Sequence, residues 1–307
     1  MGRSYAIIGT GAIGGYYGGL LARAGNEVHF LFHHDCDYVR QHGLTVESVN
    51  GDFVLEKVNA YEHAEDMPCC DTIIVALKAT ANTVLADILP RVINADSTII
   101  LLQNGLGGEE YINSIVPGQT ILGGLCFICT TKVGPGHIRH IDYGRMTLSE
   151  FRPDGMAAGL TPIAAQHVEE FQAAGIDVSV VDDLILARWK KLVWNIPFNG
   201  LSVMCRAQTD ELVMNPATRE LAVQLMREVA RGAGAFGRTI SDEFIDKNIS
   251  MTETMEPYKP SMRLDYDNKR PMEVEAIYGE PWRRAREAGV VLPGIGLLYQ
   301  LLTFLNR

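Results

Sequence analysis

The sequence predicts an α/β protein with an N-terminal Rossmann-type dinucleotide-binding domain and a C-terminal all-α domain. Three observations carry this prediction. In the first half, apolar and β-branched runs alternate with helix-like segments, as in a parallel sheet covered on both faces. A glycine-rich loop follows the first of these runs, and strand signals largely vanish after Asp183. We therefore expect two domains, residues 1–182 with the dinucleotide-binding fold and residues 183–307 with helices alone.

Length, composition and charge fit this class. The chain has 307 residues, enough for two domains, and its 47% hydrophobic and 21% charged residues are typical of a soluble protein. Its net charge of -10 argues against nucleic acid or an anionic membrane as partner. The sequence shows no signal-peptide pattern, and runs such as Thr98–Leu102 have only the length of a strand. We expect a cytoplasmic protein with reduced cysteines.

The elements of the first half follow from these patterns. We predict strands at Tyr5–Ile8, Glu27–Phe32, Thr72–Leu77, Ser97–Leu102, Gln119–Cys129 and Asp177–Val181. We predict helices at Gly14–Ala24, Ala79–Leu89 and Pro162–Ala174. Between them, residues 131–151 alternate in polarity around the turn residues Gly134-Pro135-Gly136, which predicts an antiparallel hairpin that closes the edge of the sheet.

The second half shows helical periodicity instead. We predict helices at Leu184–Asn195, Asn215–Ala235, Asp242–Ser250, Met272–Ala288 and Ile295–Leu305. Asn215 is suited to cap its helix because Pro216 follows at the first helical position.

The glycine-rich loop is a G-x-G-x-x-G motif between a strand and a helix. In this context Gly9 permits the tight turn, Gly11 lets the backbone approach a pyrophosphate, and Gly14 allows close packing of helix on strand. The alternative is an ordinary glycine-rich turn. The expected cofactor-binding residues here are Gly9, Thr10, Gly11, Ala12, Ile13 and Gly14.

The end of the second strand bears on the choice of dinucleotide. An NAD site usually has an acidic residue there that binds the ribose 2′-hydroxyl. Here Glu27 comes too early and Asp35 slightly late, so NADP is favoured over NAD. No arginine is present, so His33 or His34 would have to accommodate the 2′-phosphate. The alternative is that these histidines lie in a solvated loop.

One helix combines an apolar stripe with a polar face. Lys191, Asn195 and Asn199 are spaced i, i+4, i+8 and share a face, whereas Lys190 aligns with Trp194. One ammonium and two amides suit a pocket for a small oxo acid. Pro197 disturbs the helix, so Asn199 could follow a kink. The alternative is a solvated helix surface.

The chain resembles the ketopantoate reductase (2-dehydropantoate 2-reductase) family over nearly its whole length. The motifs that carry the resemblance are GTGAIGG at the N-terminus, ALKA at Ala76–Ala79, QNGLGG at Gln103–Gly108, VGPGHIRH, RWKKLVWNIPFN, PSMRLD at Pro260–Asp265, MEVEAIYG and RRAREAGVVLP. Their order and spacing together are specific, although no single late motif is.

The resemblance implies a role for each matching position. Lys191 matches the catalytic lysine, and Glu273 an acidic residue beside the cofactor ribose and the substrate hydroxyl. Asn195 and Asn199 match substrate-binding asparagines, and Ser261 a serine that holds the substrate carboxylate. A cap at the start of a helix is another explanation for that serine.

The resemblance also extends to the cofactor. Lys78 and Asn104 match residues that line it, Asn104 also reaching toward substrate, and Thr130 matches a small residue behind it. Three positions depart from the family: His33 replaces a frequent arginine, and Tyr258 and Thr209 stand where asparagines are common. The first bears on NADP preference and the other two on the identity of the oxo acid.

The expected activity is NADPH-dependent reduction of ketopantoate to pantoate, a step toward pantothenate and coenzyme A, with the proton from Lys191. The alternatives are a reductase of another branched 2-oxo acid, which Tyr258 and Thr209 favour, and a non-catalytic NADP-binding sensor. A lactate-type His–Asp pair is not expected, because no histidine follows His167. The histidines and the Cys126–Cys129 pair, in a strand-like run, do not form a convincing metal site. The resemblance implies that residues 1–182 bind NADP and that residues 183–307 serve substrate binding and dimerisation, so a homodimer is one possible assembly.

Overall fold

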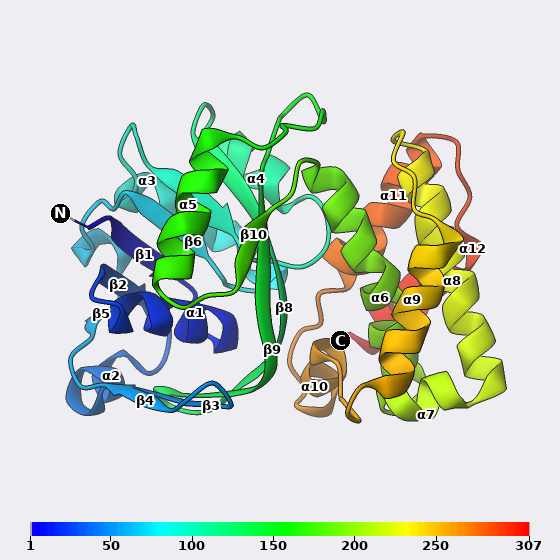
Figure 1. Ribbon diagram of the computed structural model, residues 1–307, viewed down its shortest axis with the longest axis horizontal. Helices are drawn as coiled ribbons and strands as arrows, with labels where there is room; N and C mark the ends of the chain where they lie inside the picture. Colours follow the sequence, from blue (N-terminus) through cyan, green and yellow to red (C-terminus); the bar gives the residue numbers. More distant parts are fainter. Residues whose placement is uncertain (1, 307) are drawn as a thin grey trace. The chain divides into compact units, whose positions relative to one another are not determined.

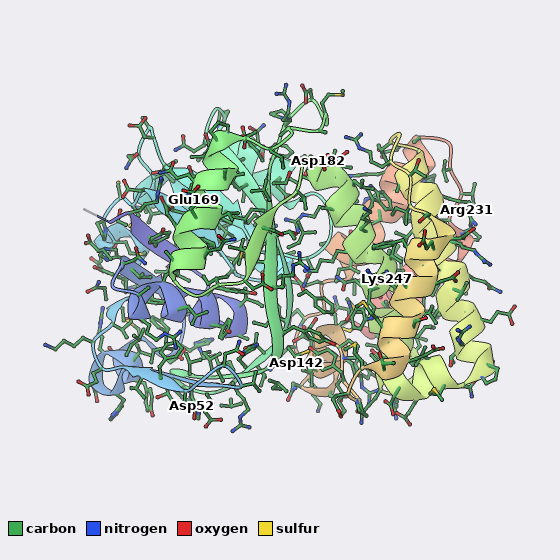
Figure 2. The ribbon with its side chains drawn as sticks, viewed as in Figure 1. Asp52, Asp142, Glu169, Asp182, Arg231 and Lys247 are labelled. Atoms are coloured by element: carbon green, nitrogen blue, oxygen red, sulfur yellow. The ribbon has the colours of Figure 1, made fainter. Side chains whose placement is uncertain are left out.

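A computed structural model describes residues 2–306 and divides the chain into two compact units (Figure 1). The first comprises Met1–Gln103 and Gly108–Leu184, and the second Asn104–Gly107 and Ile185–Arg307. The boundary predicted after residue 182 lies close to this division; Asp182 is labelled in Figure 2. The short segment Asn104–Gly107 belongs with the helices, because the Leu106 N–H donates to the Ala276 carbonyl at 3.0 Å.

The first unit is built on one ten-stranded sheet. Its strands are β1 Ser4–Ile8, β2 Glu27–Leu31, β3 Leu44–Ser48, β4 Phe53–Leu55, β5 Asn59–Tyr61, β6 Thr72–Val75, β7 Thr98–Leu101, β8 Thr120–Gly134, β9 His137–Glu150 and β10 Val178–Val180. The order is β4-β3-β9-β8-β7-β6-β1-β2-β5, with β10 paired to β9. From β5 to β8 every neighbouring pair is parallel, which confirms the predicted parallel core.

Helices cover both faces of this sheet. They are α1 Ala12–Arg23, α2 Cys36–His42, η1 Ala64–Asp66, η2 Ala79–Val84, α3 Leu85–Val92, α4 Gly108–Ile115 and α5 Pro162–Ala173. Alternate residues of each central strand enter two separate cores. Ile7 packs in the core that contains residues of α1 and α5, which lie in front of the strands in Figure 1, whereas Ile8 packs with residues of α3 and α4. Burial on both faces explains the continuous apolar runs.

The hairpin is present but does not close the sheet. β8 and β9 are antiparallel from Leu122 to Gly134, as predicted. However, β9 also pairs with β3 through His137–His140 and with β10 through Met146–Leu148. Irregularities along the β8–β9 register bend the long strands. The prediction of an edge was therefore wrong, since β9 has neighbours beyond β8.

The second unit contains only helices among its described residues. They are α6 Leu184–Cys205, which begins at the end of the first unit, α7 Thr209–Met214, α8 Pro216–Gly234, α9 Asp242–Thr254, α10 Ser261–Asp267, the π-helical turn η3 Glu275–Gly279, α11 Glu280–Glu287 and α12 Pro293–Leu305. The Asn215 side chain caps α8 by accepting from Ala217 and Thr218. Within residues 2–306, no helix combines the length and apolar character needed to cross a membrane.

A buried histidine gives the first unit a pH-dependent stability. In α5, His167 Nδ1 donates to the Ile163 carbonyl at 2.8 Å, so Nε2 accepts from the Thr72 hydroxyl at 3.1 Å. Burial lowers the pKa of His167 below its usual 6.5. As pH falls below that value, the unfolded chain gains a proton before the folded protein does, so the free energy of unfolding decreases.

We expect the free energy of unfolding to fall as pH decreases below about 6.5, and His167→Gln to remove part of this decrease. Glutamine can donate and accept as histidine does, but it does not titrate. Urea unfolding of both proteins across this pH range measures the difference. Parallel pH profiles for the two proteins would contradict the expectation.

Candidate functional site

In the glycine-rich loop between β1 and α1, the backbone leaves no room for a side chain at two of the glycines, apart from any role in cofactor binding. Gly9 has φ +97°, and a Cβ there would lie 2.4 Å from the Leu77 backbone nitrogen. A Cβ on Gly14 would lie 2.3 Å from the Gly9 carbonyl oxygen. Both positions therefore require glycine for the fold itself.

Gly11 differs, because a Cβ there would meet nothing within 4 Å. Gly11 is also the N-cap of α1, and no side chain caps this helix or places an acid in its first turn. The first N–H groups of a helix need an acceptor, and they attract anions. The open position and the uncapped helix start fit the pyrophosphate of a dinucleotide.

The predicted Lys78 follows the segment that packs on this loop. The Leu77 N–H donates to the Ile8 carbonyl at 3.1 Å, and the side-chain amide of Gln103 donates to the Leu77 carbonyl at 2.9 Å. Lys78 itself is exposed. The chain thus brings Lys78 to the same end of the sheet as Gly9.

The first acidic residue after β2, Asp35, is already held in an ion pair. Asp35 is buried, its carboxylate lies 2.6 Å from the Lys132 ammonium, and it accepts the Gly136 N–H at 2.8 Å. His33 and His34 are exposed, with ring centroids 3.8 Å apart. An acid held in an ion pair is a poor acceptor for a ribose hydroxyl, and His33 and His34 are exposed polar groups between β2 and α2.

Lys132 also lies at this site, although the sequence patterns did not predict it. Its ammonium also donates to the Thr10 carbonyl at 3.2 Å, which places a positive charge beside the glycine-rich loop. Strand alternation puts Lys132 on the same face of β8 as Thr130, two residues earlier, and could have indicated it. Thr130 is half-buried, and its hydroxyl donates to the Arg139 carbonyl at 3.1 Å.

In the second unit, Lys190 and Lys191 lie on different faces of α6, as the helical phase predicts. The Lys190 ammonium lies 5.5 Å from the centre of the Phe244 ring, and Trp194 Nε1 donates to the Thr252 hydroxyl at 3.1 Å. Both partners lie on α9, so this face of α6 packs against another helix. Lys191 projects from a different face and is partly buried.

The two asparagines of α6 are buried. Asn195 is 8% and Asn199 3% exposed, and Asn199 Oδ1 has no hydrogen-bond partner among the described residues. A buried amide oxygen without a donor is costly, and a ligand that donates a hydrogen bond would relieve that cost. Pro197 does not end the helix, since α6 continues to Cys205.

Arg188 is a second residue that was missed. It lies three residues before Lys191 and seven before Asn195, so it belongs to the same side of α6. Its side chain is only 4% exposed. Arginine is rarely buried without a functional or structural reason, and this spacing was visible in the sequence.

Two further predicted residues meet within the second unit. Asn104 Nδ2 lies 3.5 Å from a carboxylate oxygen of Glu273, which is buried. The Asn104 loop is held there because Gly105, at φ +88°, lies against the Ala276 carbonyl, where a Cβ would come within 2.2 Å. Glu273 and Asn104 are far apart in sequence, and the fold joins them.

Ser261 is exposed and is the first residue of α10. Its suggested role as a helix cap is wrong, because Pro260 occupies the cap position and no side chain caps this helix. α10 is tied to α6 by Arg263, which donates to the Ser202 carbonyl at 2.7 Å.

Two of the three departures from the family pattern, Thr209 and Tyr258, are hydrogen-bonded to each other. Thr209 is fully buried, and its hydroxyl donates to the Tyr258 carbonyl at 3.3 Å. In turn, the Tyr258 N–H donates to the Thr209 hydroxyl oxygen at 3.3 Å. The Thr209 hydroxyl therefore joins the start of α7 to the segment before α10. Within residues 2–306, no group of three or more His, Cys, Asp or Glu side chains could hold a metal ion.

Comparison with known proteins identifies the family. The family model described as ketopantoate reductase PanE/ApbA matches residues 5–153, and the model of its C-terminal part matches residues 183–306. The 2-dehydropantoate 2-reductase of Nostoc sp. is 52% identical over 99% of this chain and 95% of its own length.

Solved structures agree with this match. The 2-dehydropantoate 2-reductase of Geobacter metallireducens has a TM-score of 0.94 at 37% identity, covering 98% of this chain and 99% of that chain. The structure described as a dimeric ketopantoate reductase from Staphylococcus aureus has a TM-score of 0.82 at 25% identity, covering 99% and 98%. The chain therefore belongs to the ketopantoate reductase family of oxidoreductases.

Proposed function

We propose that this protein reduces ketopantoate to pantoate with NADPH, a step toward pantothenate and coenzyme A. The observation that carries the proposal is the polar side of α6, where Asn195 and Asn199 are buried and Asn199 Oδ1 has no partner among the described residues. The relative from Nostoc, named 2-dehydropantoate 2-reductase, supports the identity of the substrate.

The loop and α1 would hold the dinucleotide. The uncapped N–H groups at the start of α1 and the open position at Gly11 would receive its pyrophosphate, with Lys78 and Thr130 beside it. Bound NADPH supplies the hydride that the carbonyl carbon of the oxo acid receives.

The residues of the second unit would act on the substrate. Negative charge develops on the carbonyl oxygen as the carbon is reduced, and the Lys191 ammonium would stabilise that charge and donate the proton. Asn195 and Asn199 would orient the substrate, and Ser261 would bind its carboxylate. The pair of half-buried Asn104 and buried Glu273 would bind the new hydroxyl and the cofactor ribose.

The ion pair between Asp35 and Lys132 supports NADP over NAD, because it leaves this carboxylate unsuited to bind a ribose hydroxyl. We expect His33→Asp to raise the dissociation constant of NADPH by about tenfold or more, because a carboxylate repels the 2′-phosphate. NADH affinity should stay the same or improve. Fluorescence titration with each cofactor measures this, with His42→Asp, at the far end of α2, as the control of equal charge. Equal losses for both cofactors would contradict the assignment.

The substrate is tested by NADPH oxidation with a panel of 2-oxo acids that includes ketopantoate. The highest kcat/KM should belong to ketopantoate. Preference for another branched 2-oxo acid would identify the second candidate, which the Thr209–Tyr258 pairing favours. NADPH binding without turnover of any oxo acid would instead indicate a sensor. A homodimer is also part of the proposal, supported by the dimeric relative from Staphylococcus aureus.

A further inference from the structure

The hydroxyl group of Tyr278 bonds to the backbone of α6. It donates to the Ile196 carbonyl at 2.8 Å. In an α-helix this carbonyl also accepts from the N–H of Gly200, four residues later. Complete burial raises the pKa of Tyr278, so the phenol stays protonated and can donate. The hydroxyl therefore lies beside the point where the helix joins Ile196 to Gly200.

The sequence of α6 makes room for this hydroxyl. A Cβ on Gly200 would lie 2.8 Å from the Tyr278 oxygen, so a larger residue would push the phenol away. Pro197 has no N–H, which leaves the Val193 carbonyl without its usual helical donor. Both irregularities fall between Lys191 and the end of the helix, in the stretch that contains Asn195 and Asn199.

The two halves of α6 are held by different partners. Trp194 bonds to Thr252 of α9 and so fixes the half that carries Lys191. The half that carries Asn199 is held by Tyr278. Because Pro197 removes one helical hydrogen bond in this region, the angle between the halves is not fixed by the helix alone.

Tyr278 comes from the π-helical turn η3, which also reaches another part of the candidate site. The Ala276 carbonyl of this turn accepts the Leu106 N–H and covers Gly105, which positions the adjacent Asn104. Glu273 lies just before the turn. π-helical turns frequently occur at functional sites, and this one joins the Asn104 loop to α6.

We propose that Tyr278 is a positioning residue, whose hydroxyl sets the orientation of Asn199 relative to Lys191 and thereby the affinity for the 2-oxo acid. The inference rests on the proposed function. Without the hydroxyl, the Ile196 carbonyl loses its bond to η3, and the second half of α6 shifts. Asn199 then loses its alignment with a substrate that Lys191 still reaches.

The test is Tyr278→Phe in the full-length protein. We expect the KM for ketopantoate to rise about five- to tenfold, the size of one misplaced hydrogen bond, while NADPH affinity changes less than about twofold. Hydrogen exchange of the Gly200 amide should change as well. Tyr17→Phe is the matched control, because Tyr17 is also fully buried and donates to a backbone carbonyl, that of Gly144, in the first unit.

A purely structural role would lower the melting temperature of both variants and leave the KM for ketopantoate unchanged, which would overturn the inference. If Tyr278→Phe does not fold, Gly200→Ala displaces the hydroxyl while it retains the tyrosine, and the same rise in KM is expected. A wild-type protein without ketopantoate turnover would refute the proposed function instead. In that case unchanged positions of Lys191 and Asn199 in a crystal structure of Tyr278→Phe would overturn the inference.

Discussion

Replacement of Lys191 by alanine should lower kcat for ketopantoate reduction by about 10²- to 10⁴-fold, while NADPH affinity changes little. The ammonium is proposed to stabilise the developing charge on the carbonyl oxygen and to donate the proton, and no water molecule in its place would carry a positive charge. Steady-state kinetics with saturating NADPH measures kcat, and fluorescence titration measures cofactor affinity. Partial rescue by added small primary amines would identify the missing group as the ammonium.

Lys190 provides the matched control on the next position of the same helix. Its ammonium lies over the Phe244 ring of α9, an interaction worth about 0.5–1 kcal/mol in exposed settings. Lys190→Ala should therefore reduce stability slightly and leave kcat within about twofold of the wild type. Equal losses of kcat in the two variants would contradict the assignment of Lys191, because the helical phase separates the lysines.

Helical phase and loop motifs were readable from the sequence because they depend on local spacing. The apolar strands, the loop from Gly9 to Gly14 and the sorting of Lys190 from Lys191 all follow from patterns within a few residues. The fold class was confirmed for the same reason. Long, strongly periodic segments such as α8 were also predicted to within about two residues of their ends.

Short elements and long-range pairings were not readable. No local pattern predicted α2, α4, α7, α10 or the strands β3–β5, because these elements are short. The parallel pairing of β3 with β9 joins residues about 90 positions apart and leaves no local signal. The pairing of Thr209 with Tyr258 and the bond from Tyr278 to the Ile196 carbonyl of α6 likewise depend on tertiary contacts.

Substitutions of the loop glycines should also have large effects, on stability at Gly14 and on cofactor affinity at Gly11. Gly14→Ala puts a Cβ 2.3 Å from the Gly9 carbonyl oxygen, and we expect it to cost about 1–3 kcal/mol or more of stability. An alanine normally favours a helix by about 1 kcal/mol over glycine, so the sign itself tests the packing argument. Urea unfolding measures this cost directly.

Gly11→Ala should leave stability unchanged and weaken the binding of NADPH instead. Its Cβ meets no protein atom within 4 Å, and its φ of -85° is open to any residue, so stability should change by less than about 0.5 kcal/mol. The added methyl group would occupy space that the pyrophosphate needs at the start of α1, and the dissociation constant of NADPH should rise by at least about tenfold. Unchanged NADPH affinity in a stable Gly11→Ala protein would mean that the open position at Gly11 is not where the dinucleotide binds. Loss of affinity without loss of stability would assign Gly11 to the cofactor, since the fold itself has no need of a glycine there.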